Sequence, residues 1–180
     1  MHDEAMRQVL SGHQGKFFGK YRGLVNDNMD LLGRGRLEVI VPQVLGDTPV
    51  WALPCAPYAG KGIGFYALPP KDTVVWVEFE AGDPNYPIWT GFLWPPNDIP
   101  LAGFKPNEFF KTDSFAIEIN ENLPMPELTI KSLQGDAMIK ITPMEITMKA
   151  PMVTVEGAGG RKVALTGVSV SINNGGLDVM

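Results

Sequence analysis

Apolar and polar residues alternate at every second position through the last third of the chain, in blocks that hold two or three apolar residues. Alternation with a period of two is typical of β-strands that bury one face. Turn-forming pairs such as Thr142-Pro143, Ala150-Pro151 and Thr166-Gly167 end the blocks after a few residues. The apolar members of the blocks are Leu128, Ile130, Ile139, Ile141, Ile146, Met148, Val153, Val155, Val163, Leu165, Val168, Val170 and Ile172, followed by Leu177 and Val179. The pattern therefore predicts a ladder of very short strands.

This ladder is not expected to fold as a free monomer. Burying the apolar side chains of one copy yields less free energy than the ordering of its backbone costs. Several identical chains wound about one axis would supply the missing apolar contacts, with the blocks above on the axis and polar alternates such as Thr147 and Lys149 in water. We therefore predict an intertwined β-prism. The alternative is a β-sandwich shared with the N-terminal part, although strands in sandwiches usually run longer.

The N-terminal half shows longer strand patterns. Leu37, Val39 and Val41 alternate with Arg36, Glu38 and Ile40. Strands are expected over residues 20–27, 36–41, 51–54, 64–68, 74–80 and 88–93. Five or six strands in so short a stretch predict a small closed barrel, with the five-stranded OB-fold as the leading candidate. A stiff proline-rich break over residues 95–100 follows.

The expected fold class is thus all-β. We divide the chain into an N-terminal arm (residues 1–19), an OB-fold collar (20–96), a linker (97–112) and a trimeric β-helix spike (113–180).

Composition narrows the choice of partners. The 180 residues carry a formal net charge of −5. Binding a phosphate backbone requires a surplus of Lys and Arg, so nucleic acid is not an expected partner. No apolar stretch reaches the roughly 20 residues of a membrane-spanning helix, and the first eleven residues lack the apolar core of a signal peptide. We expect synthesis in the bacterial cytoplasm without a signal peptide.

Catalytic chemistry has little support in the sequence. Glu78, Glu80 and Asp83 are close together, but a solvated strand face explains them more simply than the paired carboxylates of a glycosidase. His2, His13 and Cys55 lack metal-ligand spacing, and Cys55 is expected to be a small buried residue. We predict no catalytic residue, no cofactor and no metal, and therefore no enzyme.

An ordered series of motifs carries a family resemblance. It includes Gly-Lys-Tyr-Arg-Gly at residues 19–23, Leu-Gly-Arg-Gly-Arg-Leu at 32–37 and Val-Trp-Val-Glu-Phe-Glu at 75–80. The stretch Gly-Asp-Pro-Asn-Tyr-Pro-Ile-Trp-Thr-Gly follows at 82–91. Together they resemble the phage baseplate assembly protein V family and the central spikes of type VI secretion and other contractile injection systems. The resemblance implies a homotrimeric structural spike that caps the inner tube and pierces the target cell envelope mechanically, as part of a phage tail or an extracellular particle.

Exposed arginines, a surplus of aromatic residues and an apolar end of the chain suggest contact sites. Arg34, Arg36, Trp89 and Trp94 are candidates for docking to an inner tube or hub protein of the baseplate. Leu177, Val179 and Met180 would form an apolar tip covered by a separate PAAR-like cap protein. The alternative function is an OB-fold module that binds oligosaccharide or single-stranded nucleic acid on its aromatic residues.

Overall fold

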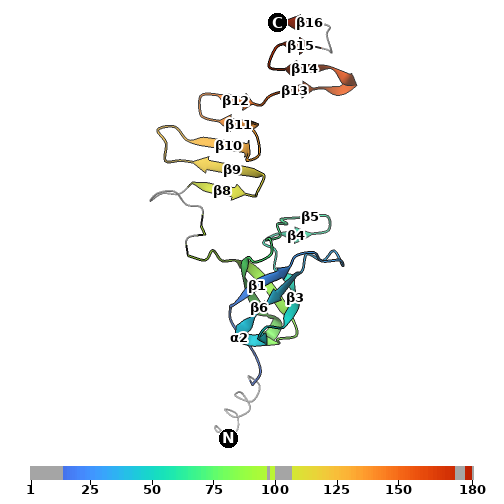
Figure 1. The fold of residues 1–180 in the computed structure, drawn as a ribbon, viewed down its shortest axis with the longest axis vertical. Coiled ribbons are helices and arrows are strands. Elements are labelled where there is room, and N and C mark those ends of the chain that lie inside the picture. Colours follow the sequence, from blue (N-terminus) through green and yellow to red (C-terminus); the bar gives the residue numbers. More distant parts are fainter. Residues whose placement is uncertain (1–13, 97, 100–106, 173–176, 180) are drawn as a thin grey trace. The chain divides into compact units, whose positions relative to one another are not determined.

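The computed structural model describes residues 14–96, 98–99, 107–172 and 177–179. The described chain is nearly all β, which confirms the expected fold class. It divides into two compact units, residues 1–99 and 100–180 (Figure 1). The finer division into arm, collar, linker and spike stays a prediction. Among the described residues, no helix combines the length and the apolar character needed to cross a membrane.

The first unit is built around a closed barrel with the strand order β1-β2-β3-β7-β6. Its neighbours pair antiparallel except β3 and β7, which run parallel with Leu53 opposite Ile88. This is the five-stranded closed barrel expected of an OB-fold. The strands are β1 (Tyr21–Asp27), β2 (Leu37–Ile40), β3 (Pro49–Pro54), β6 (Val74–Phe79) and β7 (Pro87–Phe92), with a short helix α2 (Pro42–Leu45) and a 3-10 turn η1 (Glu80–Gly82) between them.

The barrel core follows the predicted period of two. Leu37, Val39 and Val41 are fully buried, as are Val75 and Val77. Gly23 in β1 leaves room for the side chain of Val77, because a Cβ at this position would lie 2.8 Å from Cγ2 of Val77. Small-residue packing of this kind lets the barrel close around a compact set of branched side chains.

Two expectations for the first unit are wrong. Residues 64–68 do not form a barrel strand. Instead β4 (Ala59–Gly60) and β5 (Ile63–Gly64) make a two-stranded hairpin of their own. Its turn uses Gly62 with a φ of 73°, a conformation that suits glycine. Cys55 is exposed rather than buried, because it follows the end of β3.

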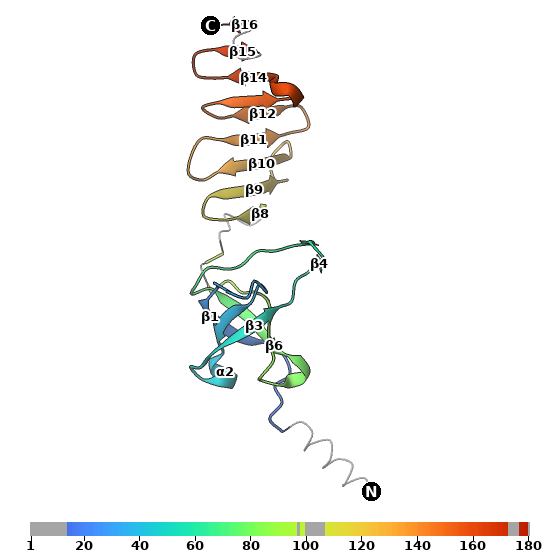
Figure 2. The ribbon, with the colours of Figure 1, turned by 90° about the vertical axis from the view of Figure 1, so that its right-hand side faces the viewer.

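The second unit holds two antiparallel sheets (Figure 2). The first has the order β12-β11-β10-β9-β8 and the second β13-β14-β15-β16. The strands are β8 (Glu108–Lys111), β9 (Phe115–Asn120), β10 (Glu127–Ser132), β11 (Met138–Ile141), β12 (Ile146–Lys149), β13 (Val153–Glu156), β14 (Lys162–Leu165), β15 (Val170–Ile172) and β16 (Leu177–Val179), with a 3-10 turn η2 (Ala158–Gly160). Strand β8 lies in the range that was expected to be a linker. This segment forms a strand because it pairs with β9.

Threonine closes three of the tight turns in this unit. Thr142 accepts a hydrogen bond from the Glu145 backbone N–H at 3.1 Å, and its own backbone N–H donates to the Glu145 carbonyl at 2.9 Å. Thr112 and Thr166 make the same pair of bonds to the residue three positions on. Side-chain capping of this kind favours a turn over further strand. The turn closed by Thr166 contains Val168, whose side chain is 84% exposed. The expectation that Val168 belongs to a strand is therefore wrong.

Candidate functional site

One face of the first sheet of the second unit is mostly apolar, with Glu108 and Ser132 at its margins. The register places Ile117, Ile130, Ile139 and Met148 in one row across β9 to β12. Phe110 in β8 continues this row. A second row consists of Ile119, Leu128, Ile141 and Ile146. We call these nine residues the first apolar face.

The second sheet repeats the arrangement. Val153, Leu165 and Val170 form one row, and the backbone of Val179 continues it. Val155, Val163, Ile172 and Leu177 form the other row. We call the residues of these two rows, apart from Val179, the second apolar face.

Both apolar faces are open to solvent in the single chain. Ile146 is 65% exposed and Val155 is 60% exposed. Soluble proteins rarely expose contiguous apolar surface of this kind unless a partner covers it. A sheet whose apolar side faces water needs a second layer to bury it. The geometry therefore points to an association surface rather than to a catalytic site.

The opposite side of the first sheet is mostly polar and carries two ion pairs between neighbouring strands. Nζ of Lys131 lies 2.7 Å from a carboxylate oxygen of Glu118, and Nζ of Lys140 lies 3.6 Å from one of Glu127. These charged groups stand on neighbouring strands, where cross-strand ion pairs stabilise a sheet modestly. The two sides of the sheet thus have distinct roles, one solvated and one available for packing.

Two family models match the chain, one in each unit. Residues 21–94 match the injector OB domain of type VI secretion systems and phage baseplates. Residues 107–178 match the C-terminal trimerisation domain of phage baseplate protein V. The chain belongs to the phage baseplate assembly protein V family. A search of curated proteins finds no significant match.

Membership in the baseplate protein V family gives the apolar faces a context. The matched domains are structural parts of a baseplate that assembles into a phage-tail particle, and the second supports a homotrimer. Both apolar faces lie within the range matched to the trimerisation domain. All the predicted axis residues except Val168 belong to these faces. Their position on a trimer axis stays a prediction.

The sequence interpretation left three members of the first apolar face out of the predicted axis. Ile117 and Ile119 in β9, and Phe110 in β8, share rows with the predicted residues. The alternation of Ile117 and Ile119 with Glu118 and Asn120 was a usable signal. Because β9 pairs with β10, continuing the rows of Leu128 and Ile130 across that pair leads to these residues.

The predicted tip of this baseplate protein is described only in part. Leu177 is 56% exposed at the start of β16. The side chain of Val179 and all of Met180 lie outside the described residues.

Two of the four predicted docking residues are engaged inside the first unit. Trp89 is only 7% exposed, and its Nε1–H donates to the Gly35 carbonyl at 3.2 Å. The Arg36 guanidinium is paired with Asp30 at 2.7 Å and lies over the Trp51 ring at 4.9 Å from the centroid. Side chains committed in this way offer little surface to a partner, so their prediction as docking residues is corrected.

Arg34 and Trp94 remain available in the first unit. Arg34 is exposed, and Trp94 is 54% exposed. A hub or tube contact through these two residues stays a prediction.

Asp30 organises the loop between β1 and β2. Its carboxylate accepts hydrogen bonds from the backbone N–H groups of Leu32, Arg34 and Arg36 in addition to the Arg36 ion pair. The side-chain hydrogen bond from Arg36 is the largest cause that holds the pKa of Asp30 far below its usual range, and the backbone N–H groups add to it. The same bond raises the pKa of Arg36. The loop is therefore fixed by a largely buried charge.

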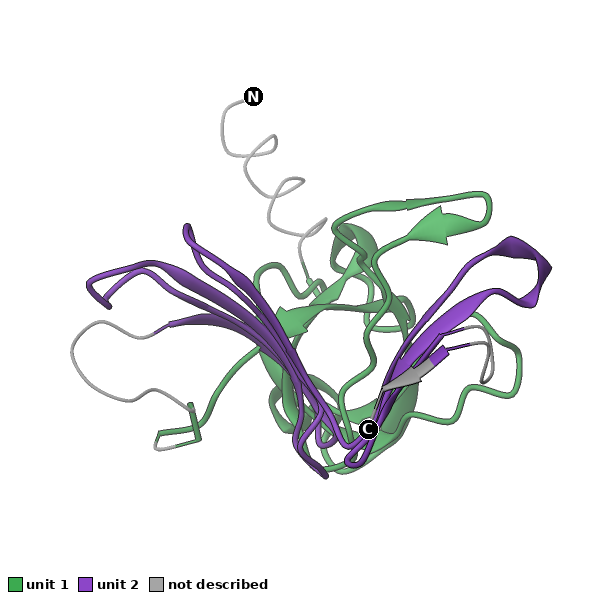
Figure 3. Cartoon of the chain, turned by 90° about the horizontal axis from the view of Figure 1, so that it is seen from above, with its two compact units in different colours: residues 1–99 green, residues 100–180 purple. Residues whose placement is uncertain are grey.

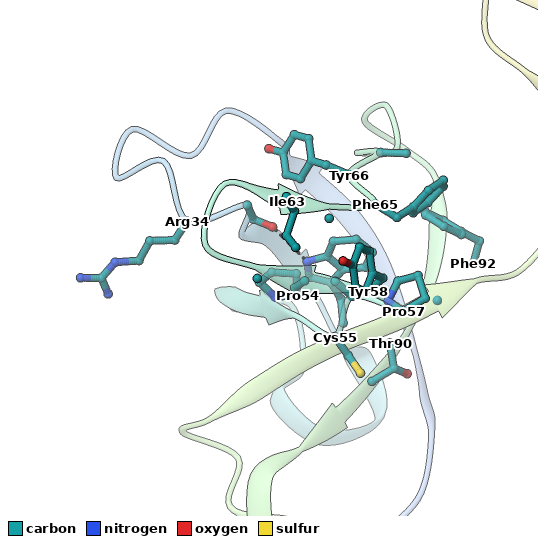
Figure 4. A pocket seen from close by; sticks show the side chains of 18 of the residues that line it. Arg34, Pro54, Cys55, Pro57, Tyr58, Ile63, Phe65, Tyr66, Thr90 and Phe92 are labelled. Carbon is teal, nitrogen blue, oxygen red and sulfur yellow. Dashed lines mark hydrogen bonds between the residues drawn. The ribbon is translucent and has the colours of Figure 1, made fainter.

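A cavity of about 760 Å³ lies in the first unit, lined by the segment that carries β4 and β5 and by the end of β7. Figure 4 shows the rings of Tyr58, Phe65 and Phe92 around it, while the Arg34 side chain extends away. Arg34 is the one charged residue among the described lining residues. Oligosaccharide recognition would require several polar groups converging on the ligand, so the cavity gives the alternative binding function no specific support.

Two of the three clustered carboxylates of the first unit, Glu78 and Asp83, take part in ion pairs. Glu78 lies 2.7 Å from Nζ of Lys20, and Asp83 lies 3.5 Å from Nζ of Lys16. The backbone N–H of Asn85 is the first cause of the lowered pKa of Asp83, with a further contribution from Lys16. Within the described part of the chain, no group of three or more His, Cys, Asp or Glu residues could hold a metal ion.

Proposed function

We propose that this protein is the central spike of a phage-tail-like contractile injection machine. Three copies would pack their first and second apolar faces around a common threefold axis to form an intertwined β-prism. The barrel unit would form the collar that caps the inner tube, and the prism would pierce the target envelope mechanically. The observation that carries the proposal is the pair of exposed, continuous apolar faces within the region matched to a trimerisation domain.

Burial on the axis would make the trimer stable. Moving a Leu, Ile or Val side chain from water to an apolar interior contributes roughly 1.5–3 kcal/mol. Each copy brings two rows of such side chains on each sheet, and three copies would bury them together. A closed prism also leaves few unpaired strand edges along its length, which gives the stiffness that mechanical penetration requires.

The ends of the trimer would contact other particle components. Arg34 and Trp94 on the barrel are candidates for the contact with the tube or hub protein, since both are exposed. Leu177 and the residues that follow it would end the prism in an apolar tip, which a PAAR-like cap protein would cover.

The native mass of the full chain provides the first test. A species of three times 19.7 kDa is expected, whereas a stable monomer would refute the spike.

The second test uses the complete particle expressed from its own sheath, tube and baseplate genes. An affinity tag on the chain, labelled with gold, should mark the baseplate end of the tube in electron micrographs. Label along the sheath or at the opposite end would exclude the tube-capping role.

Envelope piercing needs a separate readout. Particles that carry the wild-type chain should release a dye from lipid vesicles when their sheaths contract. Particles assembled with a chain that has lost its tip residues from Leu177 onward should contract equally but release less dye. Equal release by both particles would contradict a piercing role for this end of the chain.

A further inference from the structure

The two sheets of the second unit each end in an open strand edge where the chain passes from one to the other. Strand β12 is the last strand of the first sheet, and β13 is the first strand of the second. Only Ala150, Pro151 and Met152 separate them. Every other pair of consecutive strands in the unit is hydrogen-bonded within the described residues, but β12 and β13 belong to different sheets. Open edges of this kind readily pair with a strand from another chain.

The two sheets face different directions. Figure 3 shows them diverging from the place where they approach each other. Figure 1 shows the chain continuing from β12 into β13 without turning back. Pro151 suits this corner because it cannot donate a ladder hydrogen bond. The chain therefore passes from one sheet into the other, and β13 continues in the direction of β12.

We propose that β12 of one copy pairs in parallel with β13 of the next copy in the trimer. This inference rests on the proposed threefold spike. In such a prism, the two sheets of one copy would lie on two neighbouring sides. Threefold symmetry then places the first sheet of one copy on the same side as the second sheet of a neighbouring copy. Strands β12 and β13 then meet edge to edge. Both run the same way around the axis, so the pairing is parallel, whereas all pairs within the unit are antiparallel.

The side-chain pattern restricts the register, because only shifts by an even number of residues keep apolar side chains together. Both strands have four residues, Ile146–Lys149 and Val153–Glu156, and both begin with a residue of an apolar face. When the first residues of the two strands are placed side by side, Ile146 lies beside Val153 and Met148 lies beside Val155. Both apolar rows then continue from one copy into the next. A shift by one residue would put apolar side chains opposite to polar ones.

The polar side of the same alignment is complementary in charge. It places Thr147 beside Thr154 and Lys149 beside Glu156. Lys149 and Glu156 are exposed, and neither has an ion pair among the described residues of the single chain. Glu156 lies opposite Lys162 on its other side. A lysine from the neighbouring copy would complete a Lys–Glu–Lys row on the solvent-facing surface, where opposite charges on adjacent strands are favourable.

Disulfide trapping tests this pairing in the full chain. Thr147→Cys and Thr154→Cys are combined in a Cys55→Ser background, which removes the native cysteine. Neighbouring strands lie about 4.8 Å apart, within the Cα separation of about 4.4–6.8 Å that a disulfide bridges. Mild oxidation should shift the protein on a non-reducing gel from the monomer to the covalent dimer and trimer positions, and reductant should reverse the shift. Each single-cysteine variant should stay at the monomer position.

A matched control uses a pair inside one chain. Lys140 and Thr147 are opposite each other in β11 and β12, so Lys140→Cys with Thr147→Cys should link within the chain and leave the monomer band. If native mass shows a trimer but the Thr147 and Thr154 pair gives only monomer after oxidation, the strand pairing is overturned while the spike proposal stands. A monomeric native mass for the unmodified chain overturns the spike and the pairing together.

A second measurement covers the case in which the cysteine variants do not fold. Unmodified protein, half of it labelled with ¹⁵N, is refolded as a mixture and treated with a carbodiimide that joins lysine to carboxylate. Mixed-isotope peptides that link Lys149 to Glu156 are expected in the trimer. The Lys131–Glu118 ion pair, 2.7 Å apart within one chain, provides the positive control as a peptide with a single isotope. Recovery of the control link without the mixed Lys149–Glu156 link overturns the pairing.

Discussion

Ile130 in β10 lies directly opposite Ile139 in β11, and the two side chains are 41% and 37% exposed in the single chain. An apolar pair at adjacent positions of a sheet normally faces a core. Here the core is missing from the single chain, and the surrounding residues of the first apolar face share this exposure. The relationship between these two isoleucines shows why one copy of the second unit is structurally incomplete.

Replacing Ile130 by Asp is therefore expected to prevent trimer formation. It would place three carboxylates near the proposed axis, and an unpaired buried charge costs several kcal/mol per ion. Native mass spectrometry should show monomer or aggregate in place of the trimer. Thr147→Asp on the polar side of the same sheet is the control, and its trimer should persist. A normal trimer for Ile130→Asp would show that this face is not buried on assembly.

Removing residues 97–180 should leave a folded barrel that no longer forms a stable trimer. The barrel closes on itself through five strands and has its own core around Val25, Val39 and Val77. The truncated chain should melt cooperatively by circular dichroism and sediment as a monomer. A truncated chain that sediments as a trimer would assign the trimer contacts to the barrel.

Asp30→Asn should lower the melting temperature, with an effect that depends on pH. The folded-state pKa of Asp30 lies far below the ordinary value of 3.8, so its stabilising contribution is complete above that value. The contribution is lost as the pH falls below 3.8 toward the lowered pKa. The difference in melting temperature between wild type and Asp30→Asn should be constant above about pH 5 and shrink in more acidic buffer. A difference independent of pH down to about pH 2 would contradict the assigned role of the carboxylate charge.

Gly23→Ala should destabilise the barrel by crowding Val77. The new Cβ would lie 2.8 Å from Cγ2 of Val77, and overpacking of a core costs about 1–3 kcal/mol in the free energy of unfolding. Val77→Ala alone should cost about 2 kcal/mol through lost methyl groups and a cavity. Chemical denaturation of the truncated barrel would measure both.

The double variant Gly23→Ala, Val77→Ala tests the contact directly. Removing the Val77 methyl groups makes room for the new Cβ, so the combined loss should be smaller than the sum of the single losses by at least about 0.5 kcal/mol. Strict additivity would mean that the loss caused by Gly23→Ala does not come from the contact with Val77.

Local residue pattern was sufficient to predict most strands and their sides. The burial of Leu37, Val39 and Val41 follows from alternation alone, because successive side chains of a strand must point to opposite faces. The same rule grouped Ile139 with Ile141 and Val163 with Leu165. The five-stranded barrel was also predicted, since the number and spacing of the strands leave few ways to bury a single face.

The alternation of side chains along a strand could not predict contacts between residues that are distant in sequence. Trp89 became a core residue because barrel closure brings its indole N–H to the Gly35 carbonyl, 54 positions away. Residues 64–68 failed to form a strand because the hairpin of β4 and β5 takes the glycine-rich segment out of the barrel. Alternation determines which side chains share a face, since it is a property of the local backbone. The fold alone determines what covers that face, since coverage depends on strands that meet only after the chain has folded.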